Sequence, residues 1–300
     1  MSHITLNDLT IVIPTYNRNE YLLKILNTIP ANVNVIVCDN GGSVTNEIIN
    51  RYKEFSFIRP DRALEMFENW NFAISKVKTK WFIIPSDDDI YYAGAFEKIA
   101  SVINENGDTD VILFGHNIIN EFDAVLSTWA PSHFQVLKAP EGYDYFKYGV
   151  EARLPSVIFK TDVATSYSLF KETYIYTAAD SLLIQKMMLH GKTVLVPDVI
   201  SGYRVWPNNF TSKLISTSGW LEKIDQWQDE IAVHVNEVYK TKYNTLHIKD
   251  EVYARNLIAG IINMKAKHGF GPTYTFFKSV RFPWNAKMVT KLNVIKALFV

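Results

Sequence analysis

The sequence predicts an α/β fold in which a mixed, Rossmann-like sheet flanked by helices is followed by a helical C-terminal extension. Over the first hundred or so residues, short apolar runs alternate with segments whose apolar residues recur at helical spacing, as in βαβ units. Residues 213–300 instead read as helices, mainly from Trp220 to Tyr239 and from Ile248 to His268. With 300 residues and 48% hydrophobic content, the chain has enough apolar surface for a large core.

The composition narrows the classes of function and the compartment. The 31 basic and 31 acidic residues cancel, so no overall field favours nucleic acid as a partner. A single cysteine, Cys38, excludes an intrachain disulfide and suits a reducing compartment. The N-terminus lacks the pattern of a secretory signal, and no run reaches the ~18 apolar residues of a membrane span. We therefore expect a cytoplasmic protein.

Polar loops follow the predicted strands. Leu9 to Ile13 reads as the first strand and leads into the loop Pro14 to Arg18. Val33 to Cys38 reads as the second strand and leads directly to Asp39. Open α/β sheets bind their ligands at the carboxyl ends of the strands, so we expect these loops to form part of a binding site. A helix from about Leu64 to Val77 precedes the next strand.

Three adjacent acids end the apolar run from Trp81 to Ile84. Asp87, Asp88 and Asp89 repel one another unless a cation, a helix N-terminus or water offsets their charge. Oxygen ligands of this kind suit Mg²⁺ or Mn²⁺. Alternation along a strand end favours Asp87 and Asp89 as a pair, although a turn would break that parity. The competing interpretation is that Ser86 and the aspartates cap a helix that begins near Ala93.

In this order, the segments IVIPTYNR, VIVCDN, ENWNFAI and FIIPSDDDI resemble the nucleotide-binding half of family 2 glycosyltransferases with the GT-A fold. The resemblance covers residues 9–92 and continues more faintly to residue 212. It implies a metal-dependent (Mn²⁺ or Mg²⁺), inverting transfer of a sugar from a nucleotide-diphosphate donor, UDP- or dTDP-linked, to a glycan or lipid-linked glycan in surface polysaccharide synthesis. It also implies a GT-A domain over residues 1–212, with a nucleotide-binding half (1–115) and an acceptor half (116–212), and a separate extension over 213–300.

The resemblance also implies roles for individual residues. Asp39 would accept a hydrogen bond from the uracil or thymine imide, whereas in the alternative it is a turn-forming Asp beside Asn40, Gly41 and Gly42. In some relatives the principal metal ligand stands where Asp88 falls. The residues expected to bind the nucleotide sugar are Pro14, Thr15, Tyr16, Arg18, Asp39, Arg62, Asn71, Asp87, Asp88 and Arg204, and those expected to hold the metal are Asp87, Asp88 and Asp89.

Asp180 is the predicted catalytic base. An attacking acceptor hydroxyl must lose its proton, and a carboxylate beside a helix N-terminus is held in the ionised form that a base requires. Relatives carry an Asp at the start of this helix, often after a Glu that is here Ala179. The alternative is that Asp180 only caps the helix. In that case Glu172 is the next acid to test.

The end of the chain is basic and aromatic. From Lys265 to Val300 it contains seven Lys or Arg and no Asp or Glu. This pattern suits either peripheral contact with an anionic membrane surface or a solvated basic helix face. Two other functions remain open. A sugar-phosphate nucleotidyltransferase would carry a glycine-rich basic loop after the first strand, where PTYNR stands. A non-catalytic glycan- or nucleotide-binding module would not need the acidic constellation.

Overall fold

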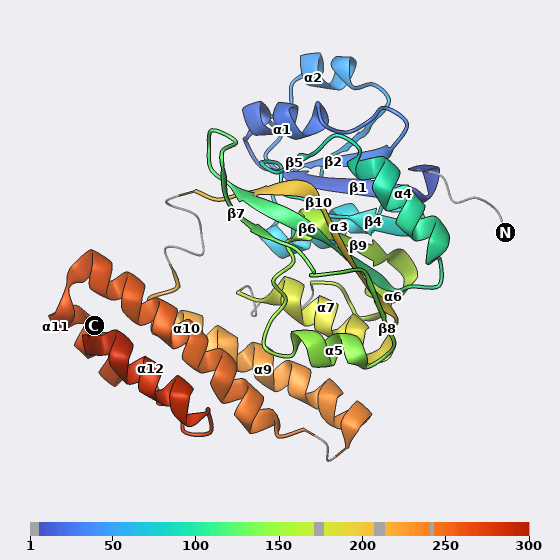
Figure 1. The fold of residues 1–300 in the computed structure, drawn as a ribbon. Coiled ribbons are helices and arrows are strands. Elements are labelled where there is room, and N and C mark those ends of the chain that lie inside the picture. Colours follow the sequence, from blue (N-terminus) through green and yellow to red (C-terminus); the bar gives the residue numbers. More distant parts are fainter. Residues whose placement is uncertain (1–5, 171–176, 207–213, 241–242, 300) are drawn as a thin grey trace. The chain divides into compact units, whose positions relative to one another are not determined.

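The computed structural model describes residues 6–170, 177–206, 214–240 and 243–299 of the chain. These residues form two compact units (Figure 1). The first, called the sheet unit, comprises Met1–Gly142, Glu151–Lys171 and His190–Val205. The second, called the helical unit, comprises Tyr143–Val150, Glu172–Leu189 and Trp206–Val300. Residues 143–150 and 177–189 thus group with the C-terminal helices, while the expected domain boundary at residue 212 stays a prediction.

One mixed sheet forms the sheet unit. Its strands run in the order β3-β2-β1-β4-β9-β6-β10-β5, with β7 paired to β6 and β8 paired to β10. Strands β1 to β4 are mutually parallel, and β9 is antiparallel to both of its neighbours. The bounds are β1 (Leu9–Thr15), β2 (Asn34–Asp39), β3 (Ser56–Ile58), β4 (Trp81–Ile83), β5 (Ile90–Tyr91), β6 (Val111–Ile119), β7 (Val125–Trp129), β8 (Gln135–Leu137), β9 (Val157–Lys160) and β10 (Thr193–Arg204).

Helices cover both faces of the strands β1 and β2. Ile11 and Ile13 of β1 share one core with Leu22 of α1 (Asn19–Leu26), and Phe96 of α4 (Ala95–Glu105) belongs to the same core, as does part of α2 (Asn46–Arg51). Because side chains alternate along a strand, Cys38 of β2 points to the opposite face. There its thiol donates to Asn69 Oδ1 of α3 (Met66–Ile74). The remaining short helices of this unit are η1 (Leu6–Asp8), η2 (Leu154–Ser156) and α6 (Thr161–Ser166).

The predicted strands and helices of the first hundred residues are confirmed. Thr15 and Asp39, the last residues of β1 and β2, are paired in register, so both loops leave the sheet at the same edge. β4 is parallel to β1 and delivers the acidic segment to that edge. The strands that the sequence did not indicate are β5, β7 and β8. β5 has two residues, and most of β7 is exposed, so neither shows a buried apolar pattern.

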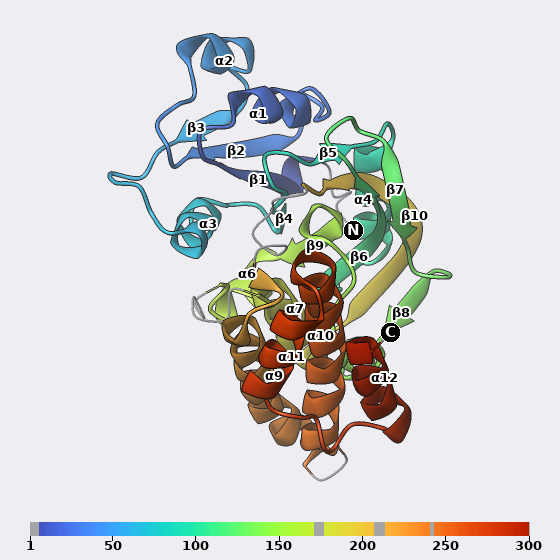
Figure 2. The same ribbon diagram turned by 90° about the vertical axis from the view of Figure 1, so that its left-hand side faces the viewer.

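Long helices dominate the helical unit (Figure 2). Inside it, Trp227 of α9 (Ser218–Tyr239) donates to Gln185 Oε1 (3.0 Å), and Gln185 donates to the carbonyl of Phe146 (2.8 Å). These bonds satisfy polar groups that would otherwise be buried without partners. Among the described residues, no helix has the length and hydrophobicity that a membrane span requires. The helices are α5 (Glu141–Phe146), α7 (Ala179–His190), α9 (Ser218–Tyr239), α10 (Thr245–His268), α11 (Phe270–Ser279) and α12 (Met288–Phe299).

Candidate active site

The acidic segment after β4 forms a tight turn. The backbone N–H of Asp89 donates to the carbonyl of Ser86 (3.3 Å), and the N–H of Ser86 donates back to Asp89 Oδ2 (2.8 Å). No helix begins here, since α4 starts only at Ala95, so the helix-cap interpretation of the three acids is wrong. All three aspartates are buried. Because burial penalises charge, such a cluster needs specific partners.

Two of the acids share a partner from the loop after β1. Arg18 Nη1 lies 3.2 Å from Asp87 Oδ1 and 2.9 Å from Asp88 Oδ2, and the Thr15 hydroxyl donates to Asp87 Oδ2 (2.7 Å). Burial raises the pKa of Asp87 to about 6, against the opposing effects of the Thr15 hydrogen bond and the Arg18 charge. Above that pH the Asp87 carboxylate is ionised beside a half-exposed guanidinium.

Asp89 points elsewhere. Besides Ser86, its carboxylate accepts a hydrogen bond from the backbone N–H of Arg204 (3.1 Å), and its side chain is fully buried. Burial, followed by the charge of Asp88, raises the pKa of Asp89 well above the usual range. The expected alternation that would pair Asp87 with Asp89 therefore does not occur, because the segment is a turn and not a strand end.

Arg204, at the end of β10, anchors the acidic turn through hydrogen bonds of its buried side chain. Its side chain is 0% exposed. Nε donates to the Asp88 carbonyl (2.7 Å), while the two terminal nitrogens reach the Asn120 carbonyl and the Asp123 carboxylate in the β6–β7 hairpin. Every nitrogen of the guanidinium thus has an acceptor within the protein. The contact to the nucleotide sugar that is expected of Arg204 stays a prediction.

Asp39 holds the loop after β2. Its Oδ1 accepts from the N–H of Ser43 (3.0 Å), and its Oδ2 accepts from the N–H of Val44 (3.1 Å) and from Arg59 (2.9 Å). These bonds are those of the turn-forming alternative. The contact between Asp39 and the nucleotide base stays a prediction. Each carboxylate oxygen of Asp39 retains limited capacity to accept the hydrogen bond that this contact requires.

Arg59 is a site residue that the sequence reasoning missed. It directly follows β3, so the same rule that drew attention to the loops after β1, β2 and β4 also indicates this position. Its guanidinium is more than half exposed while it pairs with the buried Asp39. Arg59 therefore adds another accessible cation at this edge of the sheet.

The remaining predicted nucleotide-binding residues are placed differently. Pro14 is buried within β1, whereas Tyr16 is exposed. Arg62 is largely exposed and lies 4.0 Å from Glu68. The Asn71 side chain accepts from the N–H of Phe170 (3.2 Å), so it holds the segment after α6 in place. Their contacts to a nucleotide sugar stay predictions.

Asp180 belongs to the helical unit, in the first turn of α7. The first helical hydrogen bond runs from Leu182 to the carbonyl of Ala178, so Ala178, and not Asp180, occupies the N-cap position. The Asp180 carboxylate accepts from the N–H of Ser181 (2.8 Å). Asp180 thereby stabilises the first turn as a residue of the helix and not as its N-cap. Its role as catalytic base stays a prediction. Glu172 lies outside the described residues.

Within the described ranges, no three His, Cys, Asp or Glu side chains are grouped as a ready metal site. Asp87 and Asp88 offer carboxylate oxygens on one side of Arg18, which is the donor chemistry that Mg²⁺ and Mn²⁺ use when substrate oxygens complete the shell. The pair fits a divalent ion whose remaining ligands come from outside the protein. It does not form a closed protein cage.

A mixed α/β sheet carries a buried acidic turn at the carboxyl edge of its parallel strands, as the resemblance to GT-A glycosyltransferases implies. A sequence profile described as Glycosyl transferase family 2 matches residues 10–168. This match covers more than half of the 300 residues, and the chain therefore belongs to glycosyltransferase family 2. The predicted family, fold and enzyme class are confirmed. No curated protein sequence gives a significant match.

Solved structures agree on the fold. The crystal structure of S. aureus TarS 1–349 in complex with UDP-GlcNAc aligns with a TM-score of 0.62 at 17% identity, covering 97% of this chain and 79% of that one. The mannosyltransferase PcManGT from Pyrobaculum calidifontis, in complex with GDP-Man and Mn²⁺, aligns with a TM-score of 0.53 at 14% identity, covering 97% and 85%. At these identities the likeness concerns the fold.

Proposed function

We propose that this glycosyltransferase moves a sugar, with inversion at the anomeric carbon, from a UDP- or dTDP-sugar to a glycan or lipid-linked glycan in cytoplasmic steps of surface polysaccharide synthesis. One observation carries the proposal. The loops after β1 and β4 are joined through Thr15, Arg18 and two buried acids at the edge where α/β sheets bind nucleotides. The UDP-GlcNAc bound to TarS and the GDP-Man bound to PcManGT support a nucleotide-sugar donor.

We assign the metal to Asp87 and Asp88 first, with Asp89 serving mainly to hold the turn. The Asp89 carboxylate already accepts two backbone N–H groups, whereas the other two acids face a side chain that can move. When bound, Mg²⁺ or Mn²⁺ would offset the charge that develops on the departing nucleoside diphosphate. The Mn²⁺ in the PcManGT complex supports a divalent ion without fixing its identity.

The chain's own residues then have separate tasks. The Thr15 hydroxyl orients Asp87, and Arg204 fixes the backbone of Asp88, so both carboxylates are positioned before the donor arrives. Arg18, freed from the acids, is placed to meet a phosphate oxygen, because a guanidinium forms bidentate contacts with phosphate. Asp39 would accept the imide N–H of the base, and Asp180 would take the proton of the acceptor hydroxyl.

A thermal-shift panel tests the proposal. UDP, dTDP and GDP sugars are compared with and without Mn²⁺, and the expected result is metal-dependent stabilisation by uridine or thymidine nucleotides. A ligand at a hundred times its Kd stabilises the folded state by about 2.7 kcal/mol, which such scans resolve. Equal shifts with and without metal would indicate a binding module. Stabilisation by nucleoside triphosphates and sugar phosphates in preference to nucleotide sugars would indicate a nucleotidyltransferase.

A further inference from the structure

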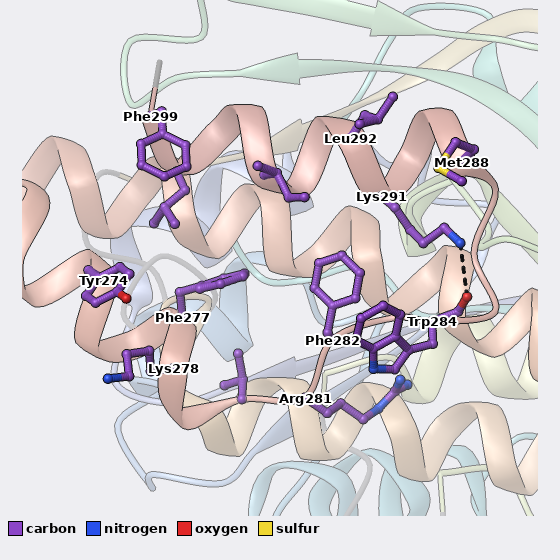
Figure 3. A pocket seen from close by; sticks show the side chains of 13 residues that line it. Tyr274, Phe277, Lys278, Arg281, Phe282, Trp284, Met288, Lys291, Leu292 and Phe299 are labelled. Atoms are coloured by element: carbon purple, nitrogen blue, oxygen red, sulfur yellow. Dashed lines mark hydrogen bonds between the residues drawn. The ribbon is translucent and has the colours of Figure 1, made fainter.

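The C-terminal helices form an open groove that is separate from the acidic turn in sequence and in composition. Residues of α11, the connecting segment and α12 line a cavity of about 600 Å³ (Figure 3). Its wall is mainly hydrophobic and includes Phe277, Phe282, Trp284, Met288, Leu292 and Phe299. None of the residues that the proposed sugar transfer uses lines this groove.

Helix α12 has two apolar faces. Val294 and Leu298 are buried and anchor the helix within the helical unit. Met288, Leu292, Ile295 and Phe299 recur at helical spacing and are exposed, Leu292 by 57%. Trp284, just before the helix, is 74% exposed. A surface helix of a soluble protein normally turns its polar side outwards, so a contiguous exposed apolar stripe marks a contact surface.

The charge around this stripe has one sign. Lys278 and Lys291 line the groove, and Lys287 and Lys296 are exposed on or beside α12. The segment from Lys265 to Phe299 contains no acid. Acids from neighbouring helices form ion pairs within the helical unit, since Asp225 and Asp250 bind Arg281. Glu251 is likewise engaged, with Thr290 (2.9 Å) and the backbone N–H of Lys287.

We propose that the groove formed by α11 and α12 docks the chain on the surface of a bilayer that contains anionic phospholipids. The exposed apolar stripe would enter the boundary between headgroups and acyl chains, while the lysines meet the phosphates. Exposed tryptophan beside lysine is favourable at that depth. A helix of 12 residues is about 18 Å long and cannot cross the ~30 Å hydrocarbon core, so α12 lies in the interface.

A second copy of the chain is the less favoured occupant. In a two-fold interface the same patch faces itself, so Lys278, Lys287, Lys291 and Lys296 of one copy would face the same lysines of the other. Like charges brought together in this way destabilise the contact. Anionic headgroups complement the patch, whereas a second copy repeats its charge.

Vesicle flotation of the full chain tests the proposal. Vesicles of phosphatidylcholine with about a third phosphatidylglycerol should carry the protein upwards, and pure phosphatidylcholine should carry much less. Lys287→Gln with Lys296→Gln should weaken partition ~30-fold, at roughly 1 kcal/mol for each basic residue near the surface. Trp284→Ser with Leu292→Ser should weaken it at least about tenfold, because both side chains leave the apolar stripe.

Matched controls separate docking from folding. Leu246→Ser, at an exposed position of α10 outside the groove, and Lys53→Gln, on the sheet unit, should float like the parent chain. All variants should keep the parent's melting temperature and nucleotide binding, so a failure of docking is distinguishable from a failure of the proposed transfer. Absence of flotation on anionic vesicles would overturn the proposal. It would also be overturned by flotation that both double variants retain, or by self-association in solution that the Trp284 and Leu292 changes abolish.

Discussion

Replacing Arg204 with lysine separates an anchoring role for this residue from direct contact with the diphosphate. The guanidinium is completely buried and donates in three directions, to the Asp88 carbonyl, the Asn120 carbonyl and the Asp123 carboxylate. A lysine ammonium at the end of a flexible chain cannot span three acceptors that a planar fork reaches. At least two of the hydrogen bonds are therefore lost.

The expected cost follows from those bonds. A hydrogen bond to a charged group contributes about 1.5–3 kcal/mol, so Arg204→Lys should destabilise the sheet unit by about 3–5 kcal/mol. For a unit of this size that corresponds to a melting temperature lower by roughly 10 °C. The control is Asp123→Asn, whose side chain is 47% exposed and still accepts from Arg204, with an expected cost below about 1 kcal/mol.

Differential scanning calorimetry measures the melting temperature, and titration calorimetry measures nucleoside diphosphate binding in the same samples. Arg204→Lys should lower both stability and affinity, because the turn that carries Asp87 and Asp88 loses its support. If the lysine variant kept the parent's melting temperature and lost only nucleotide binding, Arg204 would be a ligand contact and the anchoring argument would be refuted.

Three further predictions concern single positions. Burial, with the nearby charge of Arg153, lowers the pKa of His116 to about 4, so the unfolded chain takes up a proton between pH 6.5 and 4 that the folded chain does not. As the pH falls through that window, the free energy of unfolding of the parent should drop by up to ~3 kcal/mol relative to that of His116→Phe. Parallel pH–stability curves for the two proteins would contradict this prediction. A Cβ at Gly41 would overlap the Asn17 side chain, so Gly41→Ala should cost about 1–3 kcal/mol of stability and weaken nucleotide binding. Gly271→Ala, in α11 and with open space around it, should not destabilise the chain in the same melts. Asp180→Asn should keep the melting temperature and donor binding while lowering turnover ~10²–10⁴-fold in a transfer assay. Turnover near that of the parent would mean that Asp180 has a purely structural role.

The sequence predicts most of the sheet edge because the ends of the strands can be recognised from the residue pattern. Apolar runs such as Trp81 to Ile84 stop abruptly at polar residues, and parallel strands bring those residues together. What it does not predict is where each side chain points. The Asp89 side chain accepts hydrogen bonds from backbone N–H groups because residues 86–89 form a turn. The alternation of side chains along a strand does not predict this direction.

Long-range partners are the second gap. Arg204 is 115 residues from Asp89 in the chain, and only the pairing of β10 with β5 and β6 brings them together. Arg59 escaped notice for a different reason. Its strand, β3, has three residues and is partly exposed, so the sequence does not show where this strand ends or that Arg59 directly follows it.

Calorimetry on the acidic turn tests the central claim most directly. The parent chain is titrated with UDP, dTDP and GDP, each in Mn²⁺ and in a chelator, and compared with Asp87→Asn/Asp88→Asn and with Glu97→Gln, an exposed acid on α4. We predict metal-dependent binding of UDP or dTDP to the parent and to Glu97→Gln, with affinity at least ~10-fold weaker, by about 1.4 kcal/mol or more, in the double variant. Nucleotide binding that is equal in all three proteins and indifferent to Mn²⁺ would contradict the claim that Asp87 and Asp88 hold the metal of a glycosyltransferase site.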